Sequence, residues 1–118
     1  MTGFISKKSV KNNMKIENQL KALNNPIRLN ILEWLKKPLD NFPPHESGLS
    51  FEIGVCISYI QDKAGISQSA TSQYMTILHN ADFVISTRIG KWTYFRRNEE
   101  GINQFMNELN AILKNTGD

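Results

Sequence analysis

The spacing of apolar residues predicts two helices in the first third of the chain. Ile16, Leu20 and Leu23 recur at i, i+4 and i+7, which indicates an amphipathic helix from about residue 12 to residue 23. A second helix follows, because Asn25 can cap it and Pro26 suits a first turn, where its missing N–H costs nothing. Its apolar face comprises Ile27, Ile31, Trp34 and Leu35, and Pro38 ends it.

Residues 38–50 (PLDNFPPHESGLS) contain three of the four prolines and show no helical period. We therefore expect a long inserted loop, which in a compact domain is either functional or mobile. Apolar residues resume at Val55, Tyr59 and Ile60, and they predict a short helix from about residue 54 to residue 64. Gly65 is a good terminator for that helix, since glycine readily adopts a positive φ.

The next predicted helix has two chemically different faces. Ser67 is a strong N-cap candidate. One side of the helix collects the apolar residues Ala70, Tyr74, Ile77, Leu78 and Ala81. The opposite side carries Gln68, Ser69, Ser72, Met75, Thr76 and His79, with Gln73 at its margin. A plain surface helix normally carries Lys and Glu, so a face of Gln, Ser and Thr is unusual for a helix that only faces solvent.

The period then changes from helix to strand and back. Residues 83–88 and 92–96 are rich in β-branched and aromatic residues, and Ile89-Gly90-Lys91 joins them. This pattern predicts a β-hairpin with a basic tip. A last helix is predicted from the apolar residues Ile102, Phe105, Met106, Leu109, Ile112 and Leu113.

The composition favours one ordinary globular domain spanning residues 1–118, with 40% hydrophobic and 21% charged residues. The net charge of +3 is mild, but the charges are segregated. Residues 1–11 are basic and are expected to form a flexible arm, whereas residues 38–61 carry acids and no Lys or Arg. A second basic block without acids comprises Arg88, Lys91, Arg96 and Arg97.

Several classes of protein are disfavoured by what the chain contains. A single cysteine, Cys56, excludes an intramolecular disulfide, and no apolar run reaches the roughly 20 residues of a membrane span. The start of the chain has no apolar signal core, so we expect a cytoplasmic protein without a membrane partner. Two distant histidines and one cysteine form no recognisable catalytic set, so an enzyme is not expected.

The short helix, the turn at Gly65 and the polar-faced helix together predict a helix-turn-helix, whose second helix enters the major groove of duplex DNA. Gln68 and Gln73 can pair with adenine through their amides, and the hydroxyls on the same helix can approach bases or phosphates. The helix N-terminus and the basic hairpin would bind phosphate. The predicted DNA-binding residues are Ser67, Gln68, Ser69, Thr71, Ser72, Gln73, Thr76, His79, Arg88, Lys91 and Arg96.

The stretch AGISQSATSQYMTIL at residues 64–78, followed by RIGKWTYF at 88–95, resembles the ArsR/SmtB family of bacterial winged helix-turn-helix repressors. LNNPIRLNIL at residues 23–32 is similar to the second helix of that family. The resemblance implies a mainly α fold with a β-hairpin wing, in which helices pack around a three-helix core. It also implies a homodimer formed by the first and last helices, a palindromic operator, nucleoid association and repression relieved by an effector.

The metal sites of this family are not reproduced in the sequence. Cys56 falls on the first of the two cysteine positions that many members use, but Ser58 takes the second. One thiolate is too few ligands for a soft metal, and residues 99–118 contain no histidine for the alternative site. We therefore expect no metal and no cofactor. Cys56 is interpreted as a small buried apolar residue, with redox modification as the alternative.

Three questions stay open at this point. The inserted loop is hypothesised to modify an effector pocket, which would take a small molecule, or the dimer surface. His79 fits a phosphate contact or a plain surface residue, and His45 could hold a metal only with ligands from elsewhere. The same scaffold also occurs in protein-interaction modules and in RNA-binding proteins, which are the alternatives to operator binding.

Overall fold

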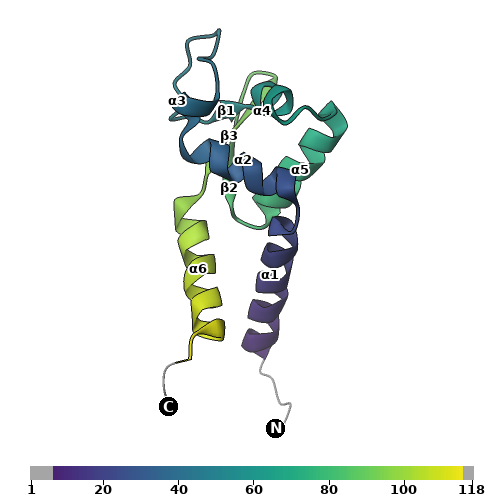
Figure 1. The fold of residues 1–118 in the computed structure, drawn as a ribbon, viewed down its shortest axis with the longest axis vertical. Coiled ribbons are helices and arrows are strands. Elements are labelled where there is room, and N and C mark those ends of the chain that lie inside the picture. Colours follow the sequence, from purple (N-terminus) through teal and green to yellow (C-terminus); the bar gives the residue numbers. More distant parts are fainter. Residues whose placement is uncertain (1–6, 116–118) are drawn as a thin grey trace.

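The computed structural model describes residues 7–115, with side chains from residue 14 onward. It contains mostly helices and one small sheet, as predicted, and the elements follow each other in a winged helix-turn-helix order (Figure 1). Their bounds are α1 Lys7–Leu23, α2 Pro26–Lys36, α3 Pro38–Asn41, β1 Val55–Cys56, α4 Ile57–Ala64, α5 Gln68–Asn80, β2 Val84–Ile89, β3 Trp92–Arg97 and α6 Glu99–Leu113.

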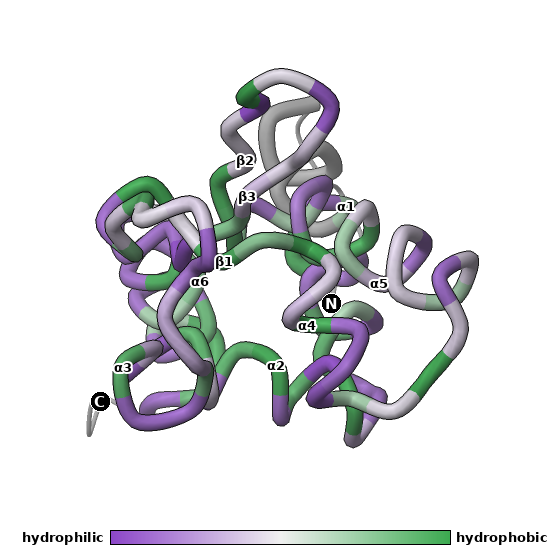
Figure 2. Tube along the Cα trace, turned by 90° about the horizontal axis from the view of Figure 1, so that it is seen from above, coloured by the Kyte–Doolittle hydropathy of each residue, from purple (hydrophilic) through white to green (hydrophobic). Residues whose placement is uncertain are grey.

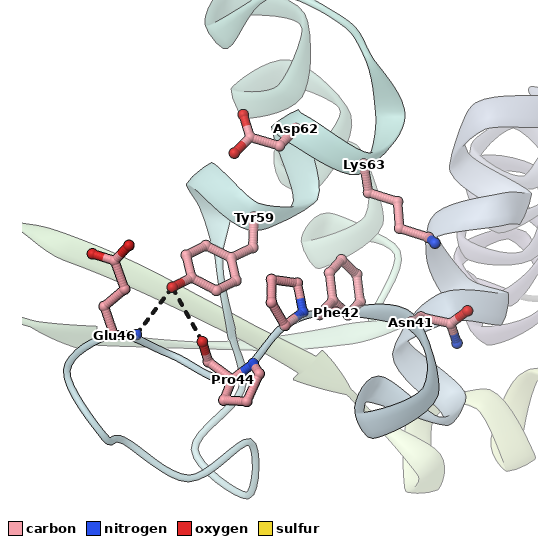
Figure 3. Close-up of a pocket in the computed structure, with 8 residues that line it drawn as sticks. Asn41, Phe42, Pro44, Glu46, Tyr59, Asp62 and Lys63 are labelled. Carbon is pink, nitrogen blue, oxygen red and sulfur yellow. Dashed lines mark hydrogen bonds between the residues drawn. The ribbon is translucent and has the colours of Figure 1, made fainter.

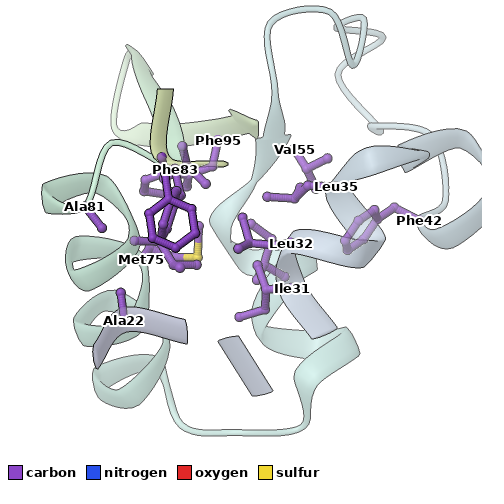
Figure 4. Close-up of a cluster of buried hydrophobic side chains, with 14 of the residues drawn as sticks. Ala22, Ile31, Leu32, Leu35, Phe42, Val55, Met75, Ala81, Phe83 and Phe95 are labelled. Carbon is purple, nitrogen blue, oxygen red and sulfur yellow. The ribbon is translucent and has the colours of Figure 1, made fainter. Parts of the chain in front are cut away.

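The hydrophobic core lies where α2, α4 and α5 meet the sheet (Figure 4). Ile31 of α2, Ile60 of α4, and Met75 and Leu78 of α5 are all completely buried. Phe83, just before β2, closes the core, and its ring packs edge-on against Phe105 of α6 at 5.2 Å between centroids. The predicted three-helix core is confirmed, and the sheet and α6 enlarge it.

The sheet has three antiparallel strands in the order β1-β3-β2, one strand more than predicted. The predicted hairpin is present as β2 and β3, which pair from Val84↔Arg97 to Ile89↔Trp92 and project from the rest of the fold (Figure 2). The extra strand β1 pairs through Val55↔Phe95 and Cys56↔Tyr94. The short helix predicted from residue 54 therefore begins only at Ile57, because residues 55 and 56 extend to complete the sheet.

Helices α1 and α6 lie along the same end of the molecule and run in opposite directions (Figure 1). Helix α1 begins at Lys7, about five residues earlier than predicted. Residues 7–11 of the expected flexible arm belong to this helix, while residues 1–6 lie outside the described residues. Among the described residues, no helix has the length and apolarity needed to cross a membrane.

The buried face of α1 differs from the predicted stripe. Ile16 is buried as expected, but Leu20 is 45% exposed and the polar Gln19 is buried in its place. Burial of Gln19 is compensated in part by a hydrogen bond from its Nε2 to the carbonyl oxygen of Ala81, at 2.9 Å, whereas its Oε1 is buried without a partner among the described residues. Among the side chains that the structure describes, the large apolar ones left exposed on α1 and α6 are Met14, Leu20, Met106, Ile112 and Leu113.

The segment 38–50 is more ordered than a plain loop. Its first residues form the short helix α3, and His45 is buried at 7% exposure. The backbone N–H of Cys56 donates to His45 Nε2 at 3.1 Å, and His45 Nδ1 lies 3.0 Å from the carbonyl oxygen of Leu49. Because Nε2 accepts, Nδ1 must carry the proton and donate to Leu49. The ring therefore ties the loop to β1.

Candidate nucleic-acid interface

Helices α4 and α5 form the predicted helix-turn-helix. Gly65 ends α4 with φ 67°, in the left-handed region that favours glycine, and its N–H donates to Gln61. Ser67 then caps α5, since its Oγ accepts from the N–H of Ala70 at 3.0 Å. Its carbonyl oxygen accepts from the N–H of Thr71 at 2.9 Å. The N–H groups of Gln68 and Ser69, at the start of the first turn, lack an acceptor within the helix, and a phosphate could approach them.

The outer face of α5 is polar and exposed along its length. Every predicted contact residue of this segment except one is exposed: Ser67, Gln68, Ser69, Ser72, Gln73, Thr76 and His79. No acidic residue occurs in α5, and Asp82 is the only acid between positions 63 and 98. Asp82 itself pairs with Lys15 at 3.2 Å. The face is thus compatible with a polyanion.

Two side chains of α5 point the other way from the prediction. Thr71 is completely buried, and its Oγ1 donates to the Ser67 carbonyl oxygen at 2.8 Å, so the expectation that it contacts DNA is corrected. Met75 was placed on the polar side but is completely buried in the core. The apolar face of α5 is wider than its apolar residues indicate, because α5 packs against α4 on one side and β2 on the other.

A groove of about 290 Å³ separates α5 from the wing. Ser72, Thr76 and His79 of α5 line one side, and Ser86, Thr93 and Phe95 of the sheet line the other. Ile57 and Met75 also line it. The hydroxyl groups of Ser86 and Thr93 were missed in the sequence analysis. Strand alternation could have found them, since both share a sheet face with Arg88.

The three basic wing residues do not lie together. Arg88 pairs with Thr93 and therefore lies on the sheet face that borders the groove. Lys91 is at the tip, with its Nζ 5.7 Å from the centre of the Trp92 ring. Arg96 shares the opposite face with Trp92 and Tyr94. Arg88 thus lies on the sheet face that borders the groove, Lys91 lies at the tip over Trp92, and Arg96 lies on the opposite face, although all three are exposed.

Two further arginines are structural. Arg97 donates to both carboxylate oxygens of Glu99, at 2.7 and 3.1 Å, and to the carbonyl oxygen of Leu32. The hydrogen bonds and charge of Arg97 hold the pKa of Glu99 below its ordinary value. Arg28 is buried at 9% exposure, and its Nε donates to the carbonyl oxygen of Ala22 at 2.7 Å. Both guanidinium groups stabilise the fold.

Cys56 is buried at 6% exposure, with its Sγ 3.3 Å from Ser58 Oγ. This placement agrees with the interpretation as a small packed residue. Across the described residues, no three His, Cys, Asp or Glu side chains are grouped in a way that could hold a metal ion. His45 and His79 lie on different sides of the sheet, one under the inserted loop and the other beside the groove.

The order of elements, the helix-turn-helix and the wing define a winged helix-turn-helix protein. The uncharacterized HTH-type transcriptional regulator YbzH of Bacillus subtilis (strain 168) is 49% identical over 93 residues, which are 79% of this chain and 93% of YbzH. The chain therefore belongs to the helix-turn-helix transcriptional regulators, with the winged fold of the ArsR-family members. No family model matches the sequence.

Solved structures share the fold at low sequence identity. The homodimeric winged helix-turn-helix DNA-binding domain of Mb0332 from Mycobacterium bovis, a possible ArsR-family regulator, superimposes with a TM-score of 0.61 at 20% identity. The match covers 95% of this chain and 90% of that one. An ArsR-like regulator from Rhodococcus sp. RHA1 also gives 0.61, at 17% identity, over 86% of this chain and 82% of that one.

Proposed function

We propose that this protein is a transcriptional repressor that binds a palindromic operator as a homodimer, through α5 and the wing. The observation that carries the proposal is the exposed, acid-free polar face of α5, which shares a groove with Ser86 and Thr93 of the wing. Gln68 and Gln73 would read bases in the major groove, while Arg88 and Lys91 bind phosphate. We place this activity in the bacterial cytoplasm.

The dimer is proposed from the apolar residues that α1 and α6 leave exposed. Met106, Ile112 and Leu113 are 54%, 56% and 72% exposed, and Met14 and Leu20 add apolar surface on α1. An exposed apolar patch of this kind marks an interaction site. Pairing two copies across these helices would bury the patch symmetrically and place two α5 helices about one turn of DNA apart.

Selection of DNA fragments from a random duplex pool tests the proposal. We expect the purified protein to enrich one inverted repeat with half-sites about 10 base pairs apart, and native mass spectrometry to give the mass of a dimer. Recovery of no common sequence would contradict operator binding and favour a protein-interaction module. Recovery of structured RNA in a parallel selection would favour RNA binding.

The signal that releases the operator is proposed to be something other than a metal. Ser58 stands where a second cysteine would be needed beside Cys56, and the thiol of Cys56 is buried. Measuring operator binding with added zinc, and after treatment with a chelator, tests this part. A change in affinity on either treatment would contradict it.

A further inference from the structure

A pocket lies between the inserted loop, the start of α4 and the wing. It has a volume of about 320 Å³ and is separate from the groove beside α5. The loop contributes His45, Glu46 and Ser47; α4 and the residue before it contribute Cys56, Ser58 and Tyr59; the wing contributes Trp92 and Tyr94. Three segments that are distant in the sequence thus meet around one cavity.

Four of the eight residues that line this pocket carry aromatic rings, namely His45, Tyr59, Trp92 and Tyr94. The His45 ring lies 5.1 Å from the Tyr59 ring and 5.3 Å from the Tyr94 ring, measured between centroids. Trp92 adds a large ring that is 44% exposed. The faces of such rings carry partial negative charge and attract cations. The wing already shows this attraction, because the Lys91 ammonium lies 5.7 Å from the Trp92 ring centre.

The lining of the pocket includes one carboxylate. Among the described residues that line it, Glu46 is the only Asp or Glu and none is Lys or Arg, while Lys91, which is not among them, lies over the Trp92 ring. The surrounding segment, residues 38–61, contains acids but no Lys or Arg. Aromatic rings bind quaternary ammonium groups in other proteins, and Glu46 adds a negative charge to the lining of this pocket.

The loop that carries Glu46 is held in place by Tyr59. The Tyr59 hydroxyl accepts from the backbone N–H of Glu46 at 3.1 Å and donates to the carbonyl oxygen of Pro44 at 3.5 Å. Figure 3 shows these bonds from the neighbouring cavity of about 470 Å³, which shares Tyr59 and Glu46 as a wall. Tyr59 of α4, the first helix of the helix-turn-helix, therefore holds the loop backbone at Pro44 and Glu46.

We propose that this pocket binds a small organic cation with an apolar shell, of the quaternary ammonium class, and that the bound cation changes operator affinity. The pocket is built from both α4 and β3, so a ligand there contacts the helix-turn-helix and the wing together. The binding of the cation does not depend on the proposed function, whereas the effect on operator affinity rests on it.

Tryptophan fluorescence tests binding without any DNA. Choline is the probe, and 3,3-dimethyl-1-butanol is its neutral counterpart of the same shape. The variant Trp34→Phe leaves Trp92 as the single reporter, since the chain has two tryptophans. We expect choline to change Trp92 emission saturably and the alcohol to bind about tenfold more weakly. Equal binding of the two compounds, or no saturable binding of choline, would overturn the proposal.

Two pairs of variants, measured by calorimetry, locate the site. Glu46→Gln should weaken choline binding several-fold, while Glu52→Gln, at an exposed acid just after the inserted loop and outside the pocket, should not. Trp92→Leu should weaken binding about 5- to 30-fold, and Trp92→Phe should restore most of it. Thermal unfolding confirms that each variant is folded. Equal effects of Glu46→Gln and Glu52→Gln would overturn the assignment.

The regulatory part is measured separately, as operator affinity with and without saturating choline. We expect a change of several-fold that disappears in Glu46→Gln. If choline binds and operator affinity stays the same, the regulatory part is overturned while operator binding itself is unaffected. If no operator is ever selected, the proposed function fails, and the fluorescence titration still decides the binding site.

Discussion

The two ends of α5 differ in how their side chains are exposed and bonded. At the first turns the side chains of Gln68, Ser69 and Gln73 are exposed and polar. At the last turn Leu78 and Ala81 are buried, and Gln19 donates to the Ala81 carbonyl oxygen. The C-terminal end is therefore held by α1 as well as by the core, while the polar side chains at the other end are available to contact a ligand.

The residues after α5 strengthen this fixed end. The N–H of Phe83 donates to the Leu78 carbonyl oxygen at 3.0 Å, and the Phe83 carbonyl oxygen accepts from Asn98 at 2.9 Å. Asp82 adds the ion pair with Lys15 at 3.2 Å. Helices α1, α5 and α6 therefore meet within a few residues, and mutations there should affect stability rather than recognition.

The largest effect is expected from Phe83→Ala at the fixed end. Phe83 is 1% exposed, and removal of its ring should lower the free energy of unfolding by about 3–5 kcal/mol, measured by chemical denaturation. If this variant does not fold, Phe83→Leu should show a smaller loss. A loss below about 1 kcal/mol for Phe83→Ala would show that the packing at this end is unimportant.

Substitutions at the exposed end should affect binding alone. Gln68→Ala or Gln73→Ala should weaken operator binding by about 1–3 kcal/mol, because a bidentate contact to a base is lost. Binding to random duplex should change much less, and the free energy of unfolding should stay within about 0.5 kcal/mol. Unchanged operator affinity in both variants would contradict the proposed role of the polar face.

The wing should contribute binding without sequence preference. Arg88→Ala or Lys91→Ala should weaken binding to operator and to random duplex equally, and should reduce the salt dependence by about one phosphate contact. Arg96→Ala is the matched control, since Arg96 lies on the other sheet face and should have a smaller effect. A larger effect of Arg96→Ala would reverse the assignment of the two faces.

Gln19→Met examines the link between α1 and the fixed end. The variant loses the hydrogen bond to the Ala81 carbonyl oxygen and should lower the free energy of unfolding by about 1 kcal/mol. Asn18→Ala, an exposed neighbour, should change it by less than about 0.5 kcal/mol. Equal stability of Gln19→Met and the original protein would indicate that α1 does not hold α5 through this bond.

The smallest effect is expected from Glu99→Gln, because Glu99 is 63% exposed and water screens its ion pair with Arg97. Its lowered pKa means that the pair stabilises the fold above the ordinary glutamate pKa of 4.5 and loses this contribution as the pH falls through the lowered pKa. The variant should lose less than about 0.5 kcal/mol at pH 7 and nothing in strong acid. Glu100→Gln serves as control, and a pH-independent difference would exclude the ion pair as the cause.

The sequence predicted the helix-turn-helix and the wing well because local signals determine them. Gly65 and Ser67 define the turn through backbone conformation and capping, and the hairpin has strand alternation on both sides of Gly90. The polar face of α5 also followed from its residue types. Thr71 and Met75 were misplaced because helix periodicity does not reveal how many neighbours pack on a helix.

The features that sequence reasoning missed depend on contacts between distant segments. Strand β1 has two residues, too few for any period, and forms by pairing with β3. His45 is buried through bonds to Cys56 and Leu49, in a segment whose composition indicates an exposed loop. Gln19 is buried because a carbonyl group at the end of α5 needs a donor. None of these partners can be found from local spacing.

The junction of α5 and α6 also limits how the sequence can change during evolution. Gly101 lies so close to Asp82 and Asn98 that an added Cβ would collide with the Asp82 carbonyl oxygen. Asp82 has φ 64°, which few residues other than Gly, Asn and Asp tolerate. One backbone contact thus constrains two positions far apart in the sequence. In a library of all single substitutions, residue 101 should accept almost nothing, whereas its neighbour Glu100, which is exposed, should accept nearly everything.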